Sequence, residues 1–158
     1  MKKLATGAAI LFFTAGIAGT TPDGAGVISD AQVKIAVTVS QQSAGPGSDA
    51  SVLVKLDPKP GIKLNKYPKI KLQVPAVDGL VAGAEQSVGN TAPPAADQLE
   101  ANYFHGGVDP LNLTLHIDPA AAKGRREIHA KLSYFYCVAA SGYCAPAKTE
   151  LTIPVTIR

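Results

Sequence analysis

The chain has 158 residues, of which 46% are hydrophobic and 17% are charged, and it contains no tryptophan. This length suits one domain, and the apolar fraction is large enough to bury a core. The net charge of +3 is too small to favour binding to nucleic acid or to an anionic membrane. Six lysines lie close together and are interpreted as the solvated side of strands and a loop: Lys55, Lys59, Lys63, Lys66, Lys69 and Lys71.

The N-terminal segment is typical of a secretory signal peptide. Two lysines precede an apolar run from Ala8 to Ala18, and small residues follow it. A membrane-spanning helix needs about 20 apolar residues, so the run is short for a retained membrane anchor, which is the alternative. We expect residues 1–18 to be removed, with cleavage after Ala18 or Gly19. This predicts a periplasmic or otherwise exported protein with no stable membrane insertion.

The rest of the chain is predicted to be one domain made of short strands. Residues 19–31 show no periodicity and are predicted to be a flexible leader, and residues 32–158 form the domain. Within the domain apolar and polar residues alternate with a period of two, which indicates half-buried strands. The predicted strands cover residues 33–40, 51–56, 70–74, 111–117, 128–136 and 151–157. The predicted breaks between them include residues 43–49, 57–61 and 83–97, the last as a long loop.

No sustained helical period follows the signal segment, so the predicted fold class is all-β. Short alternating strands separated by Gly- and Pro-rich turns favour an immunoglobulin-like, two-sheet antiparallel β-sandwich. Pro154 lies inside the last predicted strand, on its outward face. Because proline removes one donor from the hydrogen-bond ladder, this strand is expected to be an edge strand or to carry a bulge.

The only two cysteines, Cys137 and Cys144, flank a hairpin-like connection between the last two predicted strands. Directly opposed residues of antiparallel strands have Cα atoms about 4.5–5.5 Å apart, and a disulfide needs roughly 4.4–6.8 Å. An even number of cysteines in an exported chain therefore predicts one bridge. The C-x6-C spacing differs from the C-x-x-C of thioredoxin and from the paired spacing of zinc knuckles, so no metal is expected.

Two functions of this bridge remain open. As a structural staple, a loop of about eight residues contributes roughly 2.5 kcal/mol in chain-entropy theory. As a redox-active pair, a short bridge near a surface loop is accessible to an attacking thiolate. No Lys, Arg or His lies between the cysteines, and the nearest cation in the sequence is Lys148, so neither thiol has a local activating charge. No hydrolase signature is present, and His116 and His129 are expected on outward strand faces.

A resemblance to a known family bears on this choice. The segment from Lys131 to Val155, K-L-S-Y-F-Y-C-V-A-A-S-G-Y-C-A-P-A-K-T-E-L-T-I-P-V, resembles the N-terminal periplasmic domain of the DsbD thiol:disulfide interchange protein family. Two shorter segments, P-G-I-K-L-N at 60–65 and N-Y-F-H-G at 102–106, are similar to the family's P-G-aromatic segment and cap-loop motif. The chain departs from the pattern by one extra residue between the cysteines, and by Asn102 and Tyr103 at positions where the family has acidic residues.

The resemblance implies an exchange of electrons through the two cysteines, in a free-standing form of the domain and without a cofactor. It implies a membrane-embedded electron-transfer protein as donor and periplasmic thioredoxin-like or disulfide-isomerase-like proteins as acceptors. It further implies Phe104 as the cap-loop aromatic over the pair and Tyr143 as the aromatic before the second cysteine, with Tyr103 and His105 as supporting residues. The alternative is a non-catalytic immunoglobulin-like binding or structural module with an inert disulfide.

Overall fold

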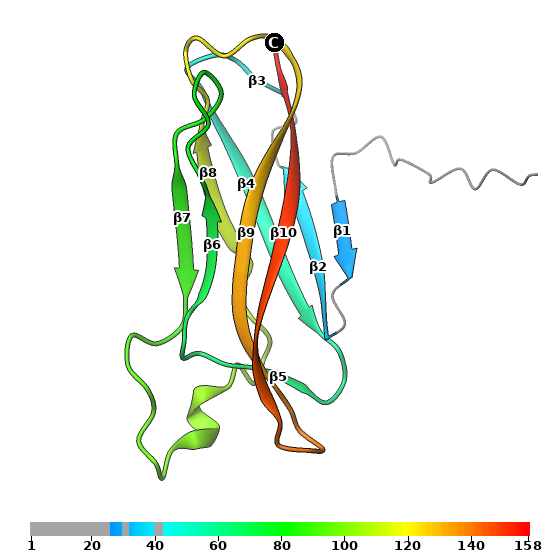
Figure 1. Cartoon of the computed structure of the whole chain (residues 1–158), viewed down its shortest axis with the longest axis vertical. Coiled ribbons are helices and arrows are strands. Elements are labelled where there is room, and N and C mark those ends of the chain that lie inside the picture. Colours follow the sequence, from blue (N-terminus) through cyan, green and yellow to red (C-terminus); the bar gives the residue numbers. More distant parts are fainter. Residues whose placement is uncertain (1–25, 30–31, 40–42) are drawn as a thin grey trace, which may run out of the picture.

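The computed structural model describes residues 26–29, 32–39 and 43–158, and there the chain forms two sheets packed face to face (Figure 1). The first sheet has the strand order β1-β2-β4-β8, and the second has the order β3-β10-β9-β6-β7, with β5 also paired to β9. The strands of the first sheet are β1 (Gly26–Ser29), β2 (Val33–Val39), β4 (Asp49–Pro58) and β8 (Leu111–His116). Those of the second are β3 (Ser43–Ala44), β5 (Ile62–Leu64), β6 (Ile70–Val74), β7 (Ala84–Val88), β9 (Gly124–Val138) and β10 (Cys144–Ile157).

The strand order is of the immunoglobulin type. In that fold one sheet carries the strands G, F, C and C′ side by side, and the other carries A, B and E. Here β10, β9, β6 and β7 follow the first order, and β2, β4 and β8 follow the second. The predicted all-β antiparallel sandwich is therefore confirmed, with each of the six predicted strands present. The β9–β10 hairpin takes the place of the F–G hairpin.

Side-chain alternation explains how the two sheets enclose one core. Val52, Val54 and Leu56 on β4 are buried, whereas Leu53 and Lys55 between them are exposed. The same alternation places the inward residues of β6, β8, β9 and β10 in a single apolar cluster. Its fully buried side chains include Ile70, Leu72, Leu115, Ile128, Leu132, Leu151 and Ile153. Burial of this cluster is the main force that holds the sheets together.

Strands also form where the sequence predicted a loop or a leader. Residues 84–88 lie in the predicted long loop, yet they form β7 along the edge of β6. Residues 26–29 of the predicted leader pair with β2 as β1. These segments lack a strong alternating pattern, and their strand form depends on pairing with a neighbouring strand. The predicted signal peptide and the rest of the leader lie outside the described residues. Within the described part, no helix is long and apolar enough to cross a membrane.

The last strand was predicted to be an edge strand or to carry a bulge, and it is an edge strand along most of its length. β10 pairs with β9 along its whole length, but on its other side it pairs only with β3, at Thr156 and Ile157. The Val138 N–H donates to the Tyr143 carbonyl, which makes the next opposed pair, Cys137 and Cys144, a non-hydrogen-bonded pair. Pro146 and Pro154 lie two and ten residues beyond Cys144, so their nitrogens point away from β9. Proline there costs no ladder bond and blunts the open edge.

One exposed carboxylate reinforces the β6–β7 edge. The hydrogen bond from Gln73 (2.6 Å), followed by Lys71 (3.2 Å), holds the pKa of Glu85 below its ordinary value. A carboxylate with a lowered pKa in the folded state adds stability above its unfolded pKa and loses it as the pH falls through the folded pKa. We expect Glu85→Gln to cause a small loss in the free energy of unfolding at neutral pH that disappears in acid. Urea unfolding at both pH values measures this, with Glu150→Gln as control, and a loss that persists in acid would contradict it.

Candidate functional site

The two cysteines are joined at the end of the β9–β10 hairpin. Cys137 and Cys144 are register partners, with a Cα–Cα distance of 4.0 Å and an S–S bond of 2.00 Å. The predicted bridge is therefore confirmed. It closes the hairpin just before the turn formed by residues 139–143, all of which are solvent-exposed. Among the described residues, no group of His, Cys, Asp and Glu is arranged to hold a metal ion.

The two sulfur-bearing residues differ in their exposure to solvent. Cys137 is only 3% exposed: β9 is an interior strand that pairs with β5 at this point, and the Tyr103 and Asn65 side chains contact its sulfur. Cys144 is exposed, because it begins the edge strand β10. A thiolate from another molecule can therefore approach the Cys144 side of the bond, and the Cys137 side is covered by the protein itself.

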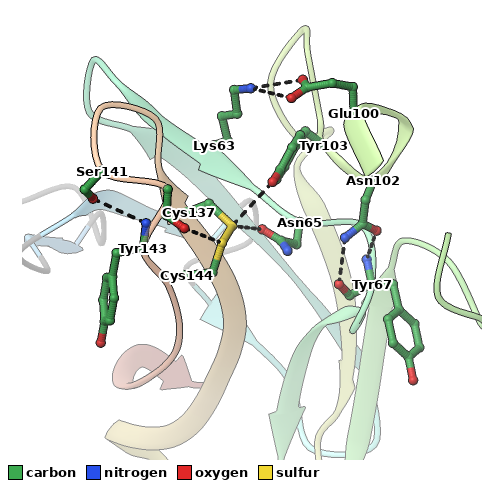
Figure 2. Close-up of a disulfide and its surroundings, with 11 residues drawn as sticks. Lys63, Asn65, Tyr67, Glu100, Asn102, Tyr103, Cys137, Ser141, Tyr143 and Cys144 are labelled. Atoms are coloured by element: carbon green, nitrogen blue, oxygen red, sulfur yellow. Dashed lines mark hydrogen bonds and ion pairs between the residues drawn. A yellow bond between two sulfur atoms is a disulfide. The ribbon is translucent and has the colours of Figure 1, made fainter. Parts of the chain in front are cut away.

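Two polar side chains reach the buried sulfur. The Tyr103 hydroxyl donates a hydrogen bond to Cys137 Sγ at 3.6 Å, and Asn65 Oδ1 lies 3.4 Å from the same sulfur (Figure 2). A disulfide sulfur carries no proton, so the Asn65 contact is not a hydrogen bond in the oxidised form. After reduction, the Cys137 thiol can donate to that oxygen.

Tyr103 directly follows the 3-10 helix η1 (Leu99–Asn102), and the two together form the cap segment, residues 99–103. Asn102 holds this segment in place: its Oδ1 accepts the Tyr67 N–H at 2.9 Å, and its Nδ2 donates to the Tyr67 carbonyl at 3.1 Å. Asn102 is buried and these bonds satisfy its amide, so removing them leaves polar groups unpaired. Asn65 and Tyr103 are also bridged through their backbones, which fixes both side chains against the disulfide.

Lys63 links the cap segment to β5 from the solvent side. Its Nζ forms an ion pair with Glu100 Oε2 at 2.9 Å and lies 4.7 Å from the centre of the Tyr103 ring (Figure 2). A cation over an aromatic face is attracted to the ring. Lys63 therefore restrains the Tyr103 ring through direct contact and through its partner on η1. This lysine was predicted to be part of a solvated charged face; its side chain is 37% exposed, and it also contacts the Tyr103 ring.

Three other residues were implied by the resemblance. Phe104 packs against the main core, with Lys66 Nζ 5.9 Å from its ring. His105 Nε2 lies 2.9 Å from the Glu100 carbonyl oxygen. Tyr143 is 60% exposed, and its ring points away from the disulfide (Figure 2). The aromatic side chain whose hydroxyl contacts a sulfur is thus Tyr103, next to the predicted Phe104.

Asn65 and Lys63 were not predicted to be part of the site. Both lie in the P-G-I-K-L-N segment, which was noted only for its similarity to the family pattern. The segment stands just before a lysine- and proline-rich stretch of the sequence. That position does not by itself indicate that Asn65 contacts Cys137, 72 residues away.

Comparison of the chain with protein-family models, with curated proteins and with solved structures finds no match. The fold and the site together define the class of the protein. It is an immunoglobulin-like β-sandwich that carries a half-exposed cross-strand disulfide under a tyrosine-bearing cap segment.

Proposed function

We propose that this chain is an exported thiol–disulfide exchange module that passes electrons between a membrane-embedded partner and periplasmic thioredoxin-like or disulfide-isomerase-like proteins. The observation that carries the proposal is the unequal exposure of the two cysteines, with Cys144 open to solvent and Cys137 buried beside Tyr103 and Asn65. A purely structural disulfide needs neither a solvent-exposed sulfur nor polar groups beside the buried sulfur. The resemblance to the DsbD N-terminal domain and the signal-like N-terminus also support this function.

The exchange runs in two steps. A donor thiolate attacks Cys144 Sγ; the new bond joins the donor sulfur to Cys144, and the Cys137–Cys144 bond breaks with its electron pair leaving on Cys137. The donor's second thiolate then attacks the donor's first sulfur in the mixed disulfide. This forms the donor's own disulfide and releases Cys144 as a thiolate. The donor dithiol has been oxidised to a disulfide, and this chain has gained two electrons and, at neutral pH, two protons. The same steps in reverse reduce an acceptor disulfide.

Single-cysteine variants test which sulfur reacts. Cys137→Ser leaves the exposed Cys144, and Cys144→Ser leaves the buried Cys137. The probe is a thioredoxin-type protein with one cysteine activated as its thionitrobenzoate disulfide. We expect Cys137→Ser to form the protein–protein disulfide and release thionitrobenzoate, and Cys144→Ser to react far more slowly, because a thiolate must be accessible to attack. Equal rates for the two folded variants would contradict the proposal.

Equilibration of the wild-type chain with glutathione buffers separates exchange from the alternative of an inert module. An exchanging pair should have a reduction potential near about −200 mV, whereas a structural bridge lies below about −300 mV. Circular dichroism of both single-cysteine variants, with thiol counts after denaturation, controls for loss of the fold. A potential in the structural range would favour the non-catalytic binding or structural module.

A further inference from the structure

Reduction of the disulfide requires the buried sulfur to carry a negative charge. When a thiolate attacks the exposed Cys144, the electron pair of the S–S bond leaves on Cys137, which is only 3% exposed. Little water can reach this anion, and burial without a hydrogen bond disfavours a charge. A buried leaving group therefore needs a donor supplied by the protein.

We propose that Tyr103 is a catalytic hydrogen-bond donor that stabilises the Cys137 thiolate as the bond breaks; this rests on the proposed exchange function and deepens it. The Tyr103 hydroxyl already points at Cys137 Sγ in the oxidised form, at 3.6 Å, and needs no rearrangement to donate to the developing anion. A hydrogen bond to an ionised acceptor is roughly twice as strong as one between neutral groups. The bond thus strengthens as charge develops on the sulfur, which is the condition for lowering the barrier.

The surroundings keep the Tyr103 hydroxyl in this position. The Tyr103 backbone N–H donates to the Glu100 carbonyl at 3.2 Å. The Tyr103 ring lies under Lys63 Nζ, which is itself paired with the Glu100 carboxylate. Lys63 is a positioning residue here, and on β5 it is the register partner of Cys137. Asn65 serves the other protonation state, because its Oδ1 can accept from the Cys137 thiol once a proton is taken up. Cys137 thus has one partner as a thiolate and another as a thiol.

Tyr103→Phe tests the proposal, since it removes the hydroxyl and keeps the ring. The first measurement is the rate of reduction of the oxidised protein by dithiothreitol at fixed pH. We expect the variant to react at least about tenfold more slowly, because it loses one hydrogen bond to a charged group. The second is the pH midpoint of the thiolate absorbance at 240 nm in reduced protein that also carries Cys144→Ser, and it should move up by about one pH unit.

Tyr67→Phe is the matched control, because Tyr67 lies on the neighbouring loop and its ring points away from the disulfide (Figure 2). It should leave both the rate and the midpoint at their wild-type values. An unchanged rate or an unchanged midpoint in Tyr103→Phe, or equal changes in Tyr67→Phe, would overturn the assignment. Both measurements use only a small thiol and the isolated chain. Their outcome is therefore independent of whether exported proteins exchange with Cys144, which the single-cysteine variants test.

Discussion

Replacing Leu132 with alanine is expected to lower the free energy of unfolding by about 2–5 kcal/mol. Leu132 is fully buried in the middle of β9, between register partners Leu72 and Thr149, and it belongs to the core cluster that both sheets share. Truncation removes its apolar surface and leaves a cavity that close-packed neighbours fill only in part. Because β9 also carries Cys137, the same variant should destabilise the strand that holds the buried cysteine of the site.

Urea denaturation of the oxidised protein measures this loss, and Leu53→Ala provides a control with the same change of side chain. Leu53 lies on the outward face of β4 and is 38% exposed. Its truncation should therefore change the free energy of unfolding by no more than about 0.5 kcal/mol. Similar losses in the two variants would mean that the described core does not dominate stability.

Replacing Gly89 with alanine is the second change expected to have a large effect. Gly89 has a φ of +121°, and an added Cβ would run into the carbonyl group of Lys66, which is backbone and cannot swing away. The positive φ alone costs roughly 1–2 kcal/mol for an L-residue, and forced contacts of this kind add about 1–3 kcal/mol. That carbonyl accepts the Asn90 N–H at 2.7 Å, so relief of the clash also breaks a hydrogen bond.

The clash should also disturb the cap segment. The Lys66 N–H donates to the Asn102 carbonyl, and Asn102 directly precedes Tyr103. We expect Gly89→Ala to increase hydrogen exchange at the amides of the cap segment as well as to lower the urea midpoint. Gly61→Ala is the control: its φ is +80°, but nothing lies within 4 Å of an added Cβ, so only the backbone cost applies. A Gly89→Ala protein that is no less stable than Gly61→Ala would contradict the close approach to Lys66.

The local pattern of the sequence predicted those parts of the fold that depend on local chemistry. Alternation along β4, β6 and β8 was sufficient, because one face of each of these strands is buried and a period of two is the direct consequence. Pro154 indicated an edge strand for a similar reason, since a missing N–H is tolerated only where no ladder partner needs it. β7 escaped prediction because Ala, Glu, Gln and Ser on an edge strand bury little, and pairing with β6 decides their conformation.

By itself, the sequence determined that the chain folds as an all-β sandwich and that Cys137 and Cys144, seven positions apart across one hairpin, meet as a disulfide. Only the tertiary structure decided which sulfur is buried and what surrounds it. The groups at Cys137 come from Asn65, which directly follows β5 and lies 72 residues earlier, and from Tyr103 in the cap segment, 34 residues earlier. Contacts between segments so far apart arise from how strands pair and sheets pack, and no local periodicity encodes them.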